Sequence, residues 1–576
     1  MKKFYSYPFH RWALPILFCW PSFLLAQDDA PMAPVSRTYA LTNATIIQAP
    51  GRKIDAATIV IKNGLIQSVG KGISIPPEAI IIKADSLFIY AGFIDGLSRT
   101  GVSKPKDDAS KERPKDPGNP TPERAGITPQ YDVRPFLNPA DKSVEEMRSI
   151  GFTAAHVVPY GGMLPGNGSV ILLGGSSADA MIVSNKNSFY SELTPAERAY
   201  PATVMGVMAK YRDLYRQATL TKNYQSLYAS NRAGLERPAS DRILEAFYPV
   251  IDKRQPVFFK AEKVLELQRV LILQKELGFT LTLINVKEGW DMIPKVKASN
   301  AQVFLSLELP EEKKDEKKAD EKKPDEKKSD SVKQVKPKSI AELEKEVLEK
   351  RRTDFVNKYV AQASSYQKAG VKFGFSALTV KSKDIPANLR RMITAGLSED
   401  AALASLTTIP AEFFGLSDRL GTLDNGKIAN LVISDKPYFN EKSKVRYVFV
   451  EGVLYKQELS EAKKADANAK VEIEGTWSVT IETPEKKAQN TLTIKKDGTM
   501  YSGTISGGQL PNLPENLNSV VLEGNVLKIT YSVSIDGKNM DMKMEVIIDG
   551  SSFKGNISVP ATSESFPVTG KKEPKL

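Results

Sequence analysis

The sequence predicts an α/β fold, with a (β/α)8 TIM-type barrel at its centre and an antiparallel β-barrel near its C-terminus. Short apolar strands alternate with helical segments through residues 89–418, as a (β/α)8 barrel requires. β-rich runs with tight turns lie on both sides of this interval, in residues 38–88 and 419–458. A further group of alternating strands occupies residues 471–576. A chain of 576 residues is long enough for these several domains.

Some elements can be placed individually. The Asn63-Gly64 pair, between two apolar runs, is typical of a tight β-hairpin turn. A helix is expected over residues 140–150, followed by a strand over 152–159. Residues 264–277 predict a second helix, and residues 340–368 predict an amphipathic helix that stops near a glycine.

Two stretches are expected to lack regular structure. Residues 311–337 repeat Glu, Lys and Asp, and such a composition cannot bury enough apolar surface to order itself. We interpret them as a flexible charged insertion in a barrel loop. Residues 459–470 are polar and predict a linker to the C-terminal domain.

The C-terminal domain, residues 471–576, has the strand spacing of an antiparallel barrel. Asp-Gly turns at Asp497, Asp536 and Asp549 separate strands with alternating apolar residues. The Gly475-x-Trp477 start resembles that of lipocalin-like barrels. This resemblance implies an interior apolar ligand, while a packed barrel without ligand or an interaction module fits the same pattern.

The N-terminus predicts export. Residues 1–26 have a basic start, an apolar run and a small residue before Gln27, which is the pattern of a secretory signal peptide. We therefore expect secretion across the inner membrane to a periplasmic or extracellular location. The single cysteine, Cys19, leaves with the signal, so no disulfide is expected. The formal net charge of +12 comes without an Arg-rich helix or aromatic-basic interleaving, so nucleic-acid binding is not expected. No segment after the signal approaches the roughly 18 apolar residues of a membrane span, so no span is expected.

The apolar run that ends in Gly92-Phe93-Ile94-Asp95 resembles the amidohydrolase superfamily of metal-dependent hydrolases. Its signature there closes the first barrel strand. Residues 421–435, with Gly426-Lys427-Ile428-Ala429, resemble the segment that returns after the barrel, most closely in the imidazolonepropionase-like branch. The resemblance implies that residues 38–88 and 419–458 form one composite β-sandwich. It also implies hydrolysis of carbon–nitrogen bonds other than peptide bonds, with zinc or another divalent metal as cofactor.

The metal-ligand positions of the family are occupied by other residue types. Leu97, Arg99, Lys260 and Asn285 stand where the resemblance implies histidines, and Leu378 stands in place of the general-base aspartate. The sequence contains two histidines, and His10 leaves with the signal. One remaining histidine cannot fill four positions, and arginine and lysine repel a metal ion. We therefore expect no metal cofactor and a degenerate site.

The replacements suggest two arrangements of the barrel mouth. Arg99 and Lys260 would place positive charge where a dication would lie, with Glu262 as counter-ion. A small anionic ligand, such as a carboxylate, could then bind through Arg99, Lys260 and Asn285. Alternatively, Arg99, Lys260 and Glu262 pair with one another and fill the vacated site.

Three function classes remain open from the sequence. The first is a metal-free pseudo-enzyme that acts as a binding or scaffolding subunit, as a homo-oligomer or together with an intact amidohydrolase. The second is an active hydrolase with a remodelled site, in which Glu262, Lys260 and His156 are catalytic. His156 also fits a hydrogen-bonded core residue, because it lies within an apolar strand. The third is a ligand-binding protein that works through its C-terminal β-barrel.

Overall fold

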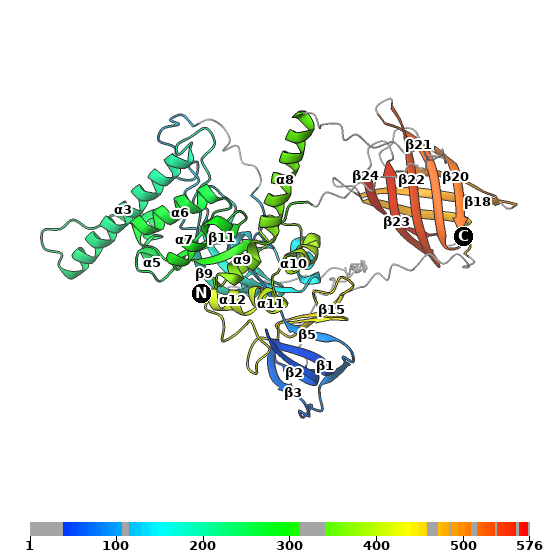
Figure 1. Cartoon of the computed structure of the whole chain (residues 1–576), viewed down its shortest axis with the longest axis horizontal. Helices are drawn as coiled ribbons and strands as arrows, with labels where there is room; N and C mark the ends of the chain where they lie inside the picture. The colour runs from blue at the N-terminus through cyan, green and yellow to red at the C-terminus, as the bar shows by residue number, and fades with distance from the viewer. Residues whose placement is uncertain are drawn as a thin grey trace, which may run out of the picture. The chain divides into compact units, whose positions relative to one another are not determined.

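The computed structural model describes residues 38–105, 114–311, 340–457, 471–482, 487–498, 500–507, 515–535, 538–559 and 564–573. The predicted signal peptide (1–26), the predicted linker (459–470) and the predicted charged insertion after Glu311 lie outside these residues. The chain divides into two compact units, Met1–Gln457 and Glu458–Leu576, and each is described by itself (Figure 1).

Strands from both segments that flank the barrel form one eight-stranded sheet in the first unit, in the order β16-β15-β14-β5-β1-β2-β3 with β4 paired to β1. β5 pairs with β1 on one side and with β14 on the other, where Ala91 lies opposite Leu431. This strand therefore joins the segment before the barrel to the segment after it. The strands are β1 (Tyr39–Ala49), β2 (Arg52–Lys62), β3 (Leu65–Gly70), β4 (Ile80–Lys83), β5 (Phe88–Ala91), β14 (Leu431–Ser434), β15 (Val445–Val450) and β16 (Val453–Lys456).

The hairpin turn in this sheet has the predicted geometry. Asn63 and Gly64 connect β2 to β3 with φ of 52° and 77°. Positive φ at both central residues is what a tight type I′ turn requires, and Asn and Gly adopt it at low cost. Many buried side chains of the sheet form an apolar cluster that includes Leu41, Ile59 and Phe449, whereas Tyr90 and Val432 belong to a cluster of the barrel.

The central domain is a nearly closed eight-stranded barrel, in the order β13-β12-β11-β10-β9-β8-β7-β6. The end strands meet where Ser376 Oγ donates a hydrogen bond to the Leu97 carbonyl oxygen at 2.9 Å. The backbone N–H of Ala377 also donates to Asp95 Oδ1 at 2.9 Å. The strands are β6 (Phe93–Ser98), β7 (Phe152–Val157), β8 (Gly166–Leu172), β9 (Ile182–Glu192), β10 (Val257–Lys260), β11 (Leu281–Val286), β12 (Gln302–Ser306) and β13 (Gly374–Ser376).

This barrel confirms the predicted fold class, with one departure from a uniform (β/α)8 barrel. β8 runs antiparallel to both β7 and β9, whereas every other pair in the barrel sheet is parallel. The connection over residues 158–165 contains no helix. A parallel neighbour needs a crossover of about a dozen residues or more, so this short glycine-containing connection gives a hairpin instead.

Helices accompany the barrel strands, and two of them begin or end near the predicted residues. α1 begins after Asp141, whose carboxylate accepts a hydrogen bond from the Ser143 N–H, and α6 ends at Gly278, whose φ of 74° is left-handed. The expected single helix over residues 340–368 is divided at Ala361 into α8 and α9. The helices are α1 (Lys142–Ser149), α2 (Ala178–Met181), α3 (Val204–Ser230), α4 (Arg242–Glu245), α5 (Tyr248–Ile251), α6 (Val264–Leu277), α7 (Ile293–Ala298), α8 (Ile340–Val360), α9 (Gln362–Lys368), α10 (Ile385–Thr394), α11 (Glu399–Leu406), α12 (Thr408–Phe413) and the 3₁₀ turns η2 (Arg134–Phe136), η3 (Trp290–Met292) and η4 (Ser382–Asp384).

Aromatic side chains fill the barrel interior. Phe414, which follows α12, stacks on Phe304 with ring centroids 5.6 Å apart and on Phe258 at 6.1 Å. These residues belong to an apolar cluster that also contains Leu97 and Tyr190. The barrel is therefore a packed core, and chemistry is confined to the ends of its strands.

The second unit is a closed antiparallel barrel of eight strands. Trp477 is buried inside it, packs against Phe553 at 5.3 Å, and donates its indole N–H to the Ile473 carbonyl oxygen at 3.0 Å. Among the described residues, no helix is long and apolar enough to cross a membrane. The strands are β17 (Gly475–Glu482), β18 (Lys487–Asp497), β19 (Met500–Gly507), β20 (Glu515–Glu523), β21 (Val526–Ile535), β22 (Lys538–Asp549), β23 (Ser552–Val559) and β24 (Glu564–Lys572).

Candidate functional site

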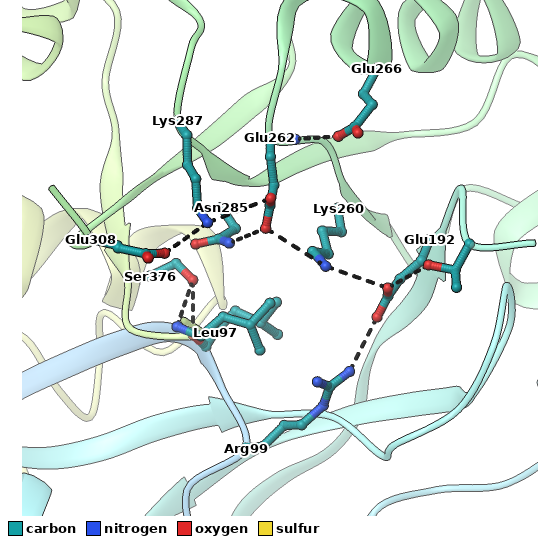
Figure 2. Close-up of polar contacts among 12 residues, drawn as sticks. Leu97, Arg99, Glu192, Lys260, Glu262, Glu266, Asn285, Lys287, Glu308 and Ser376 are labelled. Carbon is teal, nitrogen blue, oxygen red and sulfur yellow. Dashed lines mark hydrogen bonds and ion pairs between the residues drawn. The ribbon is translucent and has the colours of Figure 1, made fainter. Parts of the chain in front are cut away.

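Charged side chains of alternating sign gather at the carboxyl ends of five barrel strands. Arg99 follows β6, Glu192 ends β9, Lys260 ends β10, Lys287 follows β11 and Glu308 lies just beyond β12. The carboxyl ends of parallel strands form the face on which α/β barrels carry their active sites. The candidate site therefore lies where the fold class predicts it (Figure 2).

The first half of this array joins Arg99 to Lys260 through one buried carboxylate. Glu192 Oε1 accepts a hydrogen bond from Arg99 Nη2 at 3.2 Å, and Glu192 Oε2 lies 3.6 Å from Lys260 Nζ. The side chain of Glu192 is 7% exposed. Tyr190 and Thr194 each donate a hydroxyl hydrogen bond to it at 2.9 Å. This carboxylate is therefore held by two neutral donors as well as by two cations.

The second half continues with the same alternation of sign. Glu262 Oε1 lies 3.7 Å from Lys260 Nζ, and Glu262 Oε2 lies 3.5 Å from Lys287 Nζ. Lys287 Nζ is in turn 2.7 Å from Glu308 Oε2. Burial acts to raise the pKa of Glu308, but the hydrogen bonds from Lys287 and Thr379 and the charge of Lys287 together leave that pKa below its usual value. We call the six residues Arg99, Glu192, Lys260, Glu262, Lys287 and Glu308 the ion-pair chain.

Asn285 connects the ion-pair chain to the body of the barrel. The side-chain Nδ2 of Asn285 donates a hydrogen bond to Glu262 Oε1 at 2.8 Å, and Asn285 is fully buried. The backbone of Asn285 has a φ of 59°, within an irregular part of the β11–β12 pairing. Residues other than glycine and asparagine rarely adopt this conformation, so the asparagine suits both the backbone and the carboxylate beside it.

The two leucines at family ligand positions are part of the apolar packing. Leu97 is fully buried in the cluster that fills the barrel interior. Leu378 is half-buried and packs against the same cluster. Neither side chain has an atom that can bind a metal ion, and both contribute to the stability of the core instead.

His156 lies apart from the ion-pair chain. Its ring is buried between Phe258 and Phe414, with centroid distances of 4.7 and 5.1 Å, and its Nε2 is 2.8 Å from Ser188 Oγ. Burial lowers the pKa of His156 to about 3, so the ring is neutral near pH 7. These partners are those of a core histidine, and the structure does not bring His156 together with Glu262 and Lys260.

Asp95 is a second buried ionisable group near the seam of the barrel. Its Oδ1 accepts backbone hydrogen bonds from Leu97 at 3.2 Å and Ala377 at 2.9 Å. Burial raises the pKa of Asp95 to about 6, against the lowering effect of its hydrogen bonds. Asp95 therefore links β6 to the end of β13 through its hydrogen bonds. Its carboxyl group is buried away from water.

The residues at the barrel mouth do not fit a zinc centre of the family type. Among the residues that the structure describes, no group of three or more His, Cys, Asp or Glu side chains is arranged to hold a metal ion. Each carboxylate of the ion-pair chain has a lysine or arginine beside it. Zinc in such sites needs imidazole, thiolate or carboxylate ligands around one point, and ammonium groups cannot supply them.

A cavity with a mixed polar and apolar lining adjoins the ion-pair chain on the side of Arg99. Its volume is about 640 Å³, and Arg99 and Leu378 both contribute to its wall. The Arg99 guanidinium also lies over the ring of Tyr160, 4.4 Å from its centroid. The other lining residues include Ser98, Thr100, Ser143, Glu146, Lys381 and Lys383.

The sequence located one part of this array and missed another. Arg99, Lys260, Glu262 and Asn285 were all found at motif positions, and the structure brings them to one place. Arg99 reaches Lys260 only through Glu192, which lies outside the motifs, and Lys287 and Glu308 extend the chain further. The available signal for Glu192 was an acidic residue two positions after the apolar strand residue Tyr190.

Comparison with known proteins agrees with this geometry. The fold and the charged array at the carboxyl ends of its strands define an α/β barrel protein. Residues 324–455 match the sequence model of the Amidohydrolase family. The match and the shared fold confirm the resemblance of this chain to the amidohydrolase superfamily.

Among similar solved structures, one shares the fold of this chain. A crystal structure of an amidohydrolase from Thermotoga maritima MSB8 is similar over 73% of this chain and 100% of its own, with 20% sequence identity and a TM-score of 0.56. A Xaa-Pro dipeptidase with bound methionine in its active site covers the same 73% of this chain and 100% of its own, at 14% identity and a TM-score of 0.39. No curated protein sequence matches this chain.

Proposed function

We propose that this protein is a metal-free, non-hydrolytic amidohydrolase-like protein that acts as a binding or scaffolding subunit. The ion-pair chain is the observation that carries the proposal. It places cations at two positions where the family implies metal ligands, and it compensates them with Glu192 and Glu262. A set of fixed ammonium and guanidinium groups repels a dication, and its internal pairing makes a metal unnecessary for charge balance.

The ligand that suits this site is a small carboxylate. Lys260 Nζ lies 3.6 and 3.7 Å from its nearest carboxylate oxygens, beyond the range of an N–H···O hydrogen bond, so its donors can turn to a ligand. Arg99 presents a second cation on the other side of Glu192, with one of its nitrogens bonded to that residue. A carboxylate bound within reach of both cations, beside Glu192, would receive charge-assisted hydrogen bonds from both.

Metal content is the experiment that tests the proposal. The mature protein is expressed with excess zinc, dialysed, and analysed by atomic emission. We expect less than about a tenth of an equivalent of zinc per chain. We also expect no change of melting temperature on adding a chelator. A bound metal would stabilise the native state, and a chelator would remove that stabilisation. About one equivalent, removable by a chelator with a fall in melting temperature, would overturn the proposal.

The competing hydrolase hypothesis has its own test on the same protein. If Glu262 and Lys260 are catalytic, hydrolysis of amide substrates should be lost in the Glu262→Gln and Lys260→Ala variants. Under our proposal the wild type shows no turnover above that of both variants. A difference between wild type and variants on any carbon–nitrogen substrate would show that the site is active.

We also propose export, as the N-terminal sequence predicts. The supporting observation is the signal-peptide pattern of residues 1–26. The mass of the protein from the periplasmic fraction is expected to match a chain that begins at Gln27. A mass that includes Met1–Ala26 in the soluble fraction would contradict this.

A further inference from the structure

The helix α8 is an unusual element of the first unit, because most of its described side chains are exposed. Every side chain from Leu343 to Phe355 is exposed, and the ribbon projects away from the barrel (Figure 1). Its C-terminal end is attached: Phe355 and Tyr359 pack against Trp290 with centroid distances of 5.6 and 6.1 Å. Burial, and after it the charge of Glu308, raises the pKa of Tyr359, so the C-terminal end of the helix lies near the ion-pair chain.

Exposed apolar side chains lie along one side of this helix. Leu343, Val347, Leu348 and Phe355 are all large and exposed, and Leu348 is 67% accessible. With 3.6 residues per turn, their spacing places them within one half of the helix circumference. Single exposed leucines are ordinary on protein surfaces, but four such residues on one projecting helix indicate a contact surface.

The charges of α8 divide the helix into two halves of opposite sign. Residues 343–349 contain three glutamates and one lysine, whereas residues 350–358 contain four cations and one aspartate. Glu344 and Arg351 lie seven residues apart, on the same side as the apolar residues. An acidic half followed by a basic half is complementary to itself when two copies run antiparallel.

We propose that α8 pairs antiparallel with α8 of a second copy of this chain about a twofold axis, forming a homodimer. The pairing covers the exposed apolar residues of both helices and sets the acidic half of each against the basic half of the other. An isologous contact of this kind is the commonest form of dimer. The helix of 21 residues is about 30 Å long, so the contact is small and the dimer depends on concentration.

The segment that precedes α8 in the sequence is not suited to cover the exposed apolar residues of α8. Residues 312–338 contain Val332 and Val335 as their large apolar residues, among many lysines and acids. A segment of this composition offers no apolar face to cover Leu343, Val347, Leu348 and Phe355. A helix from another protein would need the same division into an acidic and a basic half. A second copy of this chain has that division because its α8 has the same sequence.

Light scattering of the mature full-length chain, over a concentration series up to tens of micromolar, tests the dimer. We expect a mass that rises from monomer to dimer, and a dissociation constant at least about tenfold higher in Leu348→Glu, which removes apolar contact at the interface. Leu220→Glu is the matched control, because Leu220 on α3 is 63% exposed and lies outside α8. Circular dichroism confirms that both variants fold. A wild type that stays monomeric, or a Leu348→Glu variant that dimerises like the control, overturns the proposal.

Charge reversal tests the antiparallel geometry. Glu344→Arg and Arg351→Glu should each raise the dissociation constant about tenfold, because each homodimer then opposes like charges twice. An equimolar mixture of the two variants, and the double variant Glu344→Arg/Arg351→Glu, should restore the wild-type value. If mixing restores nothing, the helices do not pair antiparallel. A monomeric wild type that nevertheless retains a different protein through α8 would equally overturn self-pairing, whatever the metal content of the barrel.

Discussion

Glu192 Oε1 accepts a hydrogen bond from Arg99 Nη2 at 3.2 Å, and this contact joins two strands that are not neighbours in the barrel sheet. Replacing Glu192 by Gln keeps the shape of the side chain and removes its charge. Arg99 and Lys260 then face each other across a neutral group. Breaking a largely buried ion pair costs about 3 kcal/mol, so we expect the free energy of unfolding to fall by that order in a urea titration.

An exposed ion pair provides the control for this prediction. Lys372 and Glu412 are 2.8 Å apart with both side chains largely exposed. Because surface pairs contribute about 0–1 kcal/mol, Glu412→Gln should change the free energy of unfolding by less than about 1 kcal/mol. Equal effects of Glu192→Gln and Glu412→Gln would mean that the ion-pair chain contributes no special stability to the barrel mouth.

Restoring a histidine at position 97 should not restore a metal site. Leu97 is fully buried in the aromatic and aliphatic interior, so Leu97→His places a polar ring in an apolar core. We expect a loss of about 3 kcal/mol in the free energy of unfolding and no gain of zinc affinity by calorimetry. The Leu97→Met variant conserves volume and should lose less than about 1.5 kcal/mol. Stoichiometric zinc binding by Leu97→His would show that the remaining ligands are already in place.

The sequence could predict those parts of the site that depend on neighbouring residues, and it could not predict contacts between residues far apart in the chain. Motif positions depend on local strand geometry, so Arg99, Lys260, Glu262 and Asn285 could be placed at one end of the barrel. The pairing within the site depends on side chains from strands far apart in sequence. Glu192 is separated from Arg99 by 93 residues, and no local pattern marks it as the counter-ion.

The same distinction applies to the fold. Alternating strands and helices predicted the barrel because hydrophobic period is a local property. The reversed direction of β8 was missed, since it follows from the short connection over residues 158–165, and the sequence pattern alone gives no strand direction. The division between α8 and α9 was missed for a related reason. Gln362 fixes α9 to the barrel by bonding the backbone of Gly289 and Val286, which are remote in sequence.

Asp95 should make the protein less stable as the pH rises. Its pKa is about 6 in the folded state against a usual value of 3.8, so between these values the folded state holds a proton that the unfolded state has lost. The linked contribution to the free energy of unfolding falls by about 3 kcal/mol from pH 4 to pH 7. Relative to wild type, Asp95→Asn should therefore gain about that amount of stability over this range. If the urea midpoints of wild type and Asp95→Asn differ by the same amount at pH 4, 5, 6 and 7, Asp95 is not a desolvated carboxyl.

His156 should act in the opposite direction with pH. Its pKa is about 3 when folded against a usual value of 6.5, so the unfolded state binds the proton first as the pH falls. The linked stability is complete above pH 6.5 and is lost by about 4 kcal/mol as the pH approaches 3. His156→Phe, which keeps a ring between Phe258 and Phe414, should show a weaker loss on acidification. Because the Asp95 and His156 effects overlap between about pH 4 and pH 6, only the single variants separate them.

The C-terminal unit should fold without the rest of the chain. Residues 471–576 contain a closed barrel with its own apolar cluster, and Trp477 lies at the centre of that cluster as the only tryptophan of this fragment. We expect a cooperative urea transition followed by the fluorescence of Trp477. Removing this ring in Trp477→Phe should cost about 2 kcal/mol, because it leaves a cavity against Phe553 and loses the hydrogen bond to Ile473. If the interior also holds an apolar ligand, a hydrophobic fluorescent probe should bind the fragment, and the ligand should displace that probe. A fragment that unfolds without cooperativity would mean that this barrel depends on the first unit for its stability.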